Sequence, residues 1–336
     1  MKAPTNRRAP RLIAAAVLPL AAALLQAGCI AEGPPTQFDR TLKVDGPVHL
    51  EILSRSGKIV VRGGAAGVVR IHGEVRGGGF LRDAVPRRLQ EIAENPPIEQ
   101  SGNTIRLGRR SSEPLFMAVS ISYTVETPAD TEVKAKTGSG GVQVSDVKEA
   151  VTASTGSGSV DVENAGDDVS LTVGSGSARA AHLGGNLTFQ CGSGAVDFDD
   201  VREEIRGTAG SGDIRIDQPR GRVTVRTGSG GIRVNGAAQD LRANTSSGNI
   251  VVSGKPAPEA FWDLGTSSGR LEITVPADAG FALTAHTSSG SVQAGLPIMI
   301  EEQSRRVLRA RVGDGRAHVN LQTSSGSIRI RQSGTS

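Results

Sequence analysis

The alternation of apolar and polar residues is the clearest pattern along the chain. From residue 142 onward, runs such as 142–144 and 160–162 place a single polar residue between two β-branched ones. Similar runs at 151–153 and 169–171 alternate in the same way and follow these segments. Alternation with a period of two over a few residues is typical of half-buried strands. The pattern therefore predicts two short strands in every repeat of 18 residues.

A glycine preceded by serine separates the two strands of each repeat. Its first seven copies are 18 residues apart, the next two steps are 21, and the last is 36, which is two periods. The ten positions are Gly140, Gly158, Gly176, Gly194, Gly212, Gly230, Gly248, Gly269, Gly290 and Gly326. A fixed period over half of a chain is the signature of a solenoid. We interpret each Ser-Gly pair as a corner whose backbone angle only glycine adopts at low cost.

Like residues form columns when the repeats are aligned. Positions 142, 160, 178, 196, 214, 232 and 250 all hold Val, Ala or Ile. Such columns arise when successive coils stack in parallel about 4.8 Å apart. The fold class predicted is all-β, a single-chain parallel β-helix with about 18 residues per coil and roughly ten to thirteen coils. No coil is stable alone, because too few side chains are buried in each to offset its chain entropy.

The same glycine-rich loops invite comparison with phosphate-binding turns. Those turns open a helix and often carry a Lys. In this chain each loop opens a strand, and no Lys follows it. The loops are therefore interpreted as architectural.

The region 38–136 departs from the strict period. Leu81, Val85, Leu89 and Ile92 have helical spacing within 81–95, which predicts a short helix that caps the solenoid. The stretch 51–63 is typical of an early, degenerate coil, and 98–107 and 117–127 are expected to be further strands. The repetitive β-helix is expected over 137–332.

The N-terminus has the composition of an export signal. Four basic residues precede an apolar run at 12–25, which is too short to span a bilayer comfortably. The run ends in 24–29, LLQAGC, which resembles the lipobox of bacterial lipoproteins. The resemblance implies a signal peptide over 1–28, an acylated Cys29 that inserts in the bilayer, and a linker over 29–37. By resemblance to the sorting rules of bacterial lipoproteins, Ile30 after the cysteine favours the outer membrane.

Charge and composition exclude several functions. The sequence holds 38 basic and 34 acidic residues, but four basic residues precede Cys29, so the exported chain is balanced. With aromatic residues at only 3%, nucleic-acid binding is not expected. The five histidines have no paired spacing, and the aspartate of calcium-binding nonapeptides is replaced by Val142 or Ile214, so neither a metal nor a cofactor is expected. Cys191 is expected to point inward.

Two outward columns of polar residues are candidates for binding. On the first strand of each repeat the outward column begins at Gln143, and Asp and Arg alternate from Asp161 to Arg215 before Arg233, which favours a charge ladder with a structural role. The second strand presents hydroxyl and amide groups, joined by Arg206, Arg226 and Arg242. The candidate ligand face is Thr152, Ser154, Ser170, Thr172, Thr188, Gln190, Thr208 and Thr224. The alternative is an ordinary solvated sheet surface.

Four pairs of adjacent acidic residues are candidates for an enzyme's carboxylates. The pairs lie at 167–168, 199–200, 203–204 and 301–302. The first three fall at the corner opposite Ser-Gly, where polar turns are expected, and their loops are too short to wall a cleft. Glycoside hydrolysis needs two carboxylates that face one another. No catalytic residue is therefore predicted.

Two stretches point to a known family. Residues 121–142 and 271–292 share the order strand, Pro-Ala-Asp, strand, Ser-Gly corner. Together with the serial Thr-Gly-Ser-Gly and Thr-Ser-Ser-Gly corners, this arrangement resembles a bacterial family of unknown function whose members are called putative adhesins. The resemblance covers about residues 40–332 and implies an exported or membrane-tethered protein with β-helix-like repeats. It supplies no catalytic or binding residues.

Three functional hypotheses follow. The first is a non-enzymatic cell-envelope lipoprotein that binds an envelope protein or a glycan through its polar sheet face. The second is a structural spacer without a specific ligand. The third, a carbohydrate-active enzyme, has the weakest support because a carboxylate cleft is not predicted.

Overall fold

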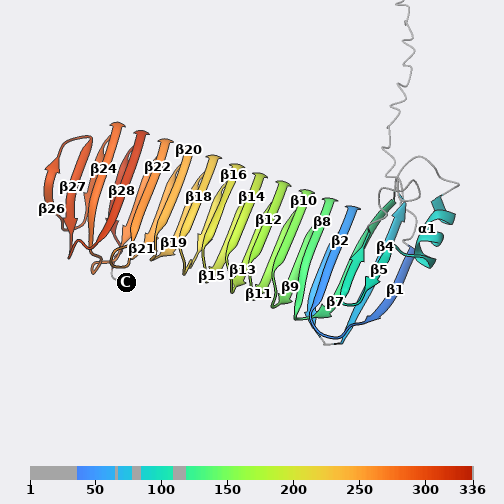
Figure 1. The fold of residues 1–336 in the computed structure, drawn as a ribbon. Coiled ribbons are helices and arrows are strands. Elements are labelled where there is room, and N and C mark those ends of the chain that lie inside the picture. The colour runs from blue at the N-terminus through green and yellow to red at the C-terminus, as the bar shows by residue number, and fades with distance from the viewer. Residues whose placement is uncertain (1–35, 65–66, 78–84, 109–118, 335–336) are drawn as a thin grey trace, which may run out of the picture. The chain divides into compact units, whose positions relative to one another are not determined.

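The computed structural model describes residues 36–64, 67–77, 85–108 and 119–334, without the side chains of residues 85 and 86. Two sheets dominate, one of 14 strands (sheet A) and one of 15 (sheet B), and the described residues contain one helix. Figure 1 shows the strands in a regular succession, with neighbouring coils side by side. The predicted all-β parallel solenoid is confirmed.

The regular coils each contribute one strand to each sheet. In sheet A these strands are β9 (Val142–Val147), β11 (Val160–Ala165), β13 (Ala178–Leu183), β15 (Val196–Val201), β17 (Ile214–Asp217), β19 (Ile232–Ala237), β21 (Ile250–Gly254) and β23 (Leu271–Val275). In sheet B they are β8 (Thr131–Ser139), β10 (Val151–Ser157), β12 (Val169–Ser175), β14 (Leu187–Ser193), β16 (Ile205–Ser211), β18 (Val223–Ser229), β20 (Leu241–Ser247) and β22 (Phe261–Ser268).

Register follows the predicted columns. Val160 lies opposite Val142 on one side and Ala178 on the other, and all neighbouring strands of these coils pair in parallel. The coil formed by β11 and β12 buries six side chains, each at most 2% exposed: Val160, Val162, Ala165, Val169, Leu171 and Val173. Like residues therefore stack on like residues between the two sheets, and the core extends without interruption from coil to coil.

The corner glycines are needed for a reason beyond the one predicted. The φ angle is positive at eight of the ten, for example 134° at Gly176. Gly248 and Gly326 are not among them, so a special backbone angle does not explain all ten. What the copies share is close stacking: a Cβ at Gly176 would lie 1.9 Å from the carbonyl oxygen of Gly158, and one at Gly248 would lie 2.0 Å from that of Gly230. Glycine is required because each corner rests on the corner of the neighbouring coil.

A buried threonine supports most corners. Thr155 Oγ1 donates a hydrogen bond to the Gly140 carbonyl oxygen at 2.9 Å, and Thr227 Oγ1 donates to that of Gly212 at 3.1 Å. In one coil Cys191 takes this position, and its Sγ lies 3.7 Å from the Gly176 oxygen. Cys191 is 5% exposed, so its predicted inward orientation is confirmed, and burial raises the pKa of its thiol.

The N-terminal end is capped by a helix and antiparallel strands. Helix α1 (Val85–Glu94) contacts β4, and its Leu89 and Ile92 join the core, so the predicted short helix is confirmed; Leu81 lies outside the described residues. The remaining strands here are β1 (Thr36–Lys43), β2 (Val48–Ser56), β3 (Ile59–Gly64), β4 (Val68–Gly77), β5 (Ile98–Ser101), β6 (Thr104–Leu107) and β7 (Val119–Pro128).

At the C-terminal end the coils are not stacked in chain order. The strands are β24 (Phe281–Ser289), β25 (Val292–Gly295), β26 (Met299–Gln303), β27 (Val307–Val312), β28 (Ala317–Ser325) and β29 (Ile328–Gln332). The last coil, β28 and β29, is inserted between β22 and β24 in sheet B and between β23 and β25 in sheet A. Figure 1 shows β28 between these neighbours. The expectation that each coil stacks on the preceding one is therefore wrong for the coil of β24 and β25, which pairs with the last coil and not with β22 and β23.

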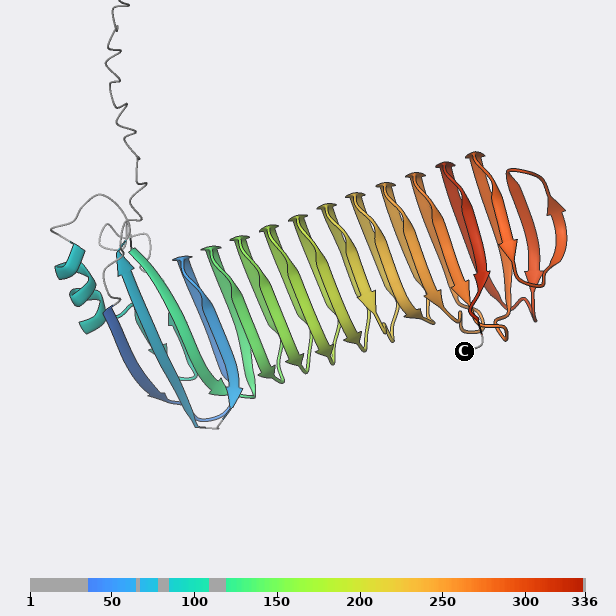
Figure 2. The same ribbon diagram turned by 180° about the vertical axis from the view of Figure 1, so that it is seen from behind.

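The N-terminal end also has a coil inserted out of chain order. The degenerate coil β2 and β3 pairs directly with β8 and β9, and β7 lies on the outer side of β3. The chain therefore passes from β7 to β8 across an intervening coil, as it does from β23 to β24. Both crossings occur at Pro-Ala-Asp, at 128–130 and 276–278, the motif shared by the two similar stretches. Seen from behind in Figure 2, the inserted strands interrupt the colour order at both ends.

Candidate functional site

The predicted ligand face lies on the outer side of sheet B. Its eight residues occupy two adjacent columns on five consecutive strands, β10 to β18. Thr152, Ser170 and Thr188 are neighbours in the first column, and Thr172 and Gln190 lie in the second. All eight are exposed or half-buried, because their strands alternate inward and outward residues. The structure therefore brings the predicted residues together on one surface.

Five cations extend these two columns. They are Lys134, Lys136, Arg206, Arg226 and Arg242, all exposed. Two are paired with acids: the Lys134 ammonium contacts Glu132 at 2.5 Å, and the Arg206 guanidinium contacts Glu204 at 2.7 Å. Lysines at 134 and 136 belong to a strand before the first regular repeat, so sequence reasoning missed their place on this face. The register of β8 with β10 puts them in the same columns.

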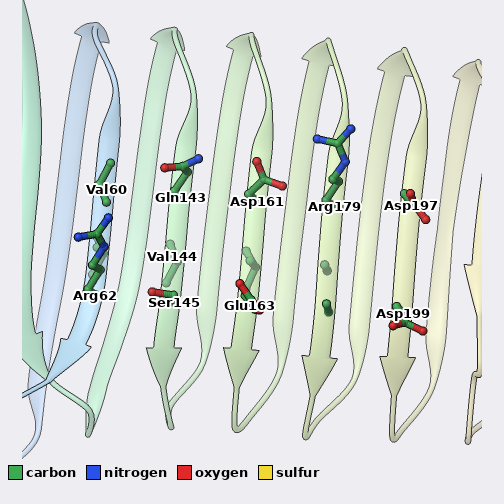
Figure 3. A pocket seen from close by; sticks show the side chains of 14 residues that line it. Val60, Arg62, Gln143, Val144, Ser145, Asp161, Glu163, Arg179, Asp197 and Asp199 are labelled. Carbon is green, nitrogen blue, oxygen red and sulfur yellow. The ribbon is translucent and has the colours of Figure 1, made fainter.

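The outer side of sheet A is hollowed. A hollow of about 590 Å³ is lined by residues of β3, β9, β11, β13 and β15. Figure 3 shows Gln143, Asp161, Arg179 and Asp197 in one row across four strands, with Glu163 and Asp199 in a second row. A second hollow of about 540 Å³ continues from Asp197 along the sheet. This is the outward column that sequence analysis interpreted as a charge ladder.

Ion pairs on sheet A support a ladder. The Arg215 Nε lies 2.6 Å from an Asp217 oxygen and 4.0 Å from an oxygen of Asp197 on the neighbouring strand. The hydrogen bond to Asp217 raises the pKa of Arg215. For Asp217, burial acts to raise the pKa, but hydrogen bonds from Asn235 and Arg215 outweigh it and the pKa is lowered. The cation of one coil thus lies between carboxylates, and pairs of this exposure contribute little individually.

The two faces carry opposite charge. Over the coils from β8/β9 to β22/β23, the two outward columns of sheet B, which start at Lys134 and Lys136, hold five basic residues and one acidic residue. The matching columns of sheet A, which start at Gln143 and Ser145, hold three basic and six acidic residues. From residue 29 onward basic and acidic residues are equal in number, so only the pairing register reveals this separation.

A third feature is a column of polar residues at the corner opposite Ser-Gly, where side chains of neighbouring coils contact one another. Asp146, Asn164, His182, Asp200 and Gln218 all have left-handed backbones, with φ between 49° and 60°. Asn164 donates to Asp146 at 2.9 Å, and His182 contacts Asp200 at 3.2 Å. The hydrogen bond from His182, with a second from Arg220, lowers the pKa of Asp200. Asn, Asp and His tolerate this backbone best, so the corner selects these residues for conformation.

The acidic pairs do not converge. Residues 167–168 and 203–204 lie in turns as expected, but 199–200 lie within β15, because the left-handed corner falls inside the strand. Glu301 and Glu302 lie on β26 and pair with Arg311 and Arg309. No group of three or more His, Cys, Asp or Glu side chains that could hold a metal ion occurs among the described residues.

The predicted lipidation site, Cys29, and the preceding signal segment lie outside the described residues. In the part of the chain that the structure describes, no helix is long and apolar enough to cross a membrane.

Two sheets of parallel coils, with glycine corners and polar outer faces, define a β-solenoid. The family comparison agrees with this class: the model of the Toastrack DUF4097 family matches residues 93–331. The chain belongs to this family, a domain family of unknown function. No curated protein matches the sequence.

Three solved structures match the chain at low sequence identity and low TM-score. A putative lipid binding protein from Parabacteroides distasonis is 13% identical, with 90% of this chain and 98% of that chain covered and a TM-score of 0.39. A putative adhesin from Bacteroides fragilis is 12% identical, with 88% and 97% covered and a TM-score of 0.27. A putative cell adhesion protein from Clostridium sporogenes is 11% identical, with 89% and 100% covered and a TM-score of 0.24.

Proposed function

We propose that this protein is a non-enzymatic cell-envelope lipoprotein that binds an extended partner through the outer face of sheet B. The observation that carries the proposal is the alignment of eight hydroxyl and amide side chains, interspersed with Arg206 and Arg226, in two columns over five strands. Parallel strands lie about 4.8 Å apart, so equivalent groups repeat at a fixed spacing. A partner that itself repeats along its length meets the same chemistry at every coil.

An acylated Cys29 would hold this surface at the membrane of the cell envelope. The acyl chains tether the N-terminus to the bilayer, with the outer membrane favoured by Ile30, and the linker separates the lipid from the solenoid. The face of sheet B is then presented in the envelope over many coils.

Photo-crosslinking in living cells tests the proposal. A photoreactive amino acid is placed at Thr152, Thr188 or Thr224 on sheet B, and at Gln143 or Asp161 on sheet A as matched controls. We expect a discrete adduct from the sheet B positions alone. Equal and diffuse labelling from both faces would overturn the proposal and leave the structural spacer.

A further inference from the structure

Three arginines form a compact group on the sheet B face. Arg206, Arg226 and Arg242 lie on three consecutive strands, β16, β18 and β20. Thr224 separates Arg206 from Arg242 in one column, while Arg226 lies between neutral residues in the next. Each guanidinium is therefore bordered by hydroxyl or amide groups rather than by another cation in its own column.

The charges of this group are only partly neutralised. Arg206 pairs with Glu204 at 2.7 Å. Neither Arg226 nor Arg242 forms an ion pair with any described residue, although both are exposed. The acid opposite Arg242 is Asp263, and its Oδ1 accepts a hydrogen bond from the Asn320 amide at 2.8 Å. On sheet A, by contrast, Arg215 is held between two carboxylates.

The composition of the face limits the kind of partner. The two outward columns from β8 to β22 contain no apolar side chain, whereas the centre of a protein interface usually needs aromatic or aliphatic anchors. Hydroxyl and amide groups match the hydroxyls of a sugar. The eight strands extend the face over roughly 34 Å, which only a polymer would follow. A guanidinium binds carboxylate or sulfate groups through two parallel hydrogen bonds.

We propose that the partner is an acidic polysaccharide, whose anionic groups bind Arg226 and Arg242 while its hydroxyls contact Thr208, Thr224 and Asn244. The inference rests on the proposed function and adds the charge of the partner. Charge complementarity supports it, because this face is basic and the opposite face is acidic in a chain whose charges balance as a whole from residue 29 onward.

Affinity electrophoresis of the full chain in a neutral detergent tests the inference. The gels contain polygalacturonate, which carries carboxylates, dextran sulfate, which carries sulfates, or neutral dextran. We expect retardation by one or both acidic polymers and none by dextran. The double variant Arg226→Gln/Arg242→Gln should bind at least about tenfold more weakly. The matched control, Arg179→Gln/Arg233→Gln, makes the same change of net charge on sheet A and should bind like the parent.

The possible outcomes separate the two proposals. Retardation by polygalacturonate alone identifies carboxylates as the bound groups, and retardation by dextran sulfate alone identifies sulfates. An equal loss in the sheet A variant would mean that net charge alone drives retardation, which overturns the inference. Absence of retardation, together with a discrete crosslink from Thr188, overturns the acidic partner but keeps the binding face. Absence of both overturns both proposals.

Discussion

At the scale of single residues, contact between neighbouring coils decides which side chain is allowed. The corner carbonyl of Gly158 lies where a side chain at Gly176 would begin. The same carbonyl row accepts hydrogen bonds from buried threonines, such as Thr155 to Gly140. Each corner is therefore specified by the coil beside it as well as by its own backbone.

Replacing a corner glycine should destabilise the solenoid. In Gly176→Ala the new Cβ would lie 1.9 Å from the Gly158 oxygen, and the backbone would keep a φ of 134° that alanine disfavours. We expect a loss of about 2–4 kcal/mol in the free energy of unfolding, measured by urea denaturation. The matched control is Gly141→Ala, whose Cβ would have no neighbour closer than 3.6 Å. It should leave stability unchanged or raise it slightly; equal effects at both positions would contradict the stacking explanation.

The pH dependence of stability is expected to have a contribution from Asp200. Hydrogen bonds from His182 and Arg220 lower its pKa in the folded state. A carboxyl with a lowered folded pKa stabilises the fold above its unfolded pKa of about 3.9, and this stabilisation is lost as the pH falls through the folded pKa. Asp200→Asn should therefore lose stability at neutral pH and show a shallower decline in acid. Asp167→Asn, in an exposed turn, serves as control, and an identical acid profile for the two variants would contradict this role.

At the scale of elements, the two ends of the stack need different covers from the regular coils. Helix α1 lies against β1 and β4, and Arg40 holds its C-terminal end by donating to the Glu94 carbonyl oxygen at 2.8 Å. At the other end, β26 and β27 add two antiparallel strands to β24. An uncovered parallel edge would leave backbone groups free to pair with another chain.

Loss of packing at helix α1 should destabilise only the elements next to it. Ile92 is fully buried at the helix contact, so Ile92→Ala should cost about 2–4 kcal/mol in that region. Because coils contact only their neighbours, hydrogen exchange should accelerate in β1 and β4 and remain unchanged in β18. Glu91→Ala, on the exposed side of the helix, should leave exchange unaltered. Uniform acceleration along the chain would show that the solenoid unfolds as one unit instead.

At the scale of the whole solenoid, the inserted coils join each end to the coils further in. The last coil of the chain, β28 and β29, lies inside the stack and pairs on both sides. The early coil β2 and β3 does the same near the N-terminus. Neither end can add or lose its terminal repeat without changing the coils beside it.

Truncation should therefore be more harmful than in a solenoid stacked in chain order. A chain that ends after residue 312 lacks the inserted coil, so β22 and β24 both lose their partner and expose open edges. We expect aggregation in size-exclusion chromatography and a loss of cooperative thermal unfolding. A chain that ends after Ser333 retains both strands and should behave like the full protein. A monomeric, cooperative 1–312 chain would contradict the inserted arrangement.

Prediction from sequence succeeded where the pattern is local and repeated. The columns through Val160 and Val169 follow directly from alternation, and the helix near Ile92 follows from its spacing. It failed where the reason lies in a neighbouring coil. Gly207 is one case: it stands in an inward column, and a Cβ there would lie 2.3 Å from Phe189 Cδ1 on the next strand. Glycine at this position leaves space for the Phe189 ring, and no local sequence pattern predicts that requirement.

The sequence by itself determined the class of fold, the coil length, the inward and outward columns and the eight polar residues of the candidate face, because all of these depend on a period that the chain repeats. Only the tertiary structure decided the order of the coils at both ends, the shared place of Lys134 and Arg226 on one face, and the opposite charge of the two sheets. These properties depend on which strands pair. Pairing joins residues far apart in the chain, so its free energy depends on contacts that no local stretch of sequence contains.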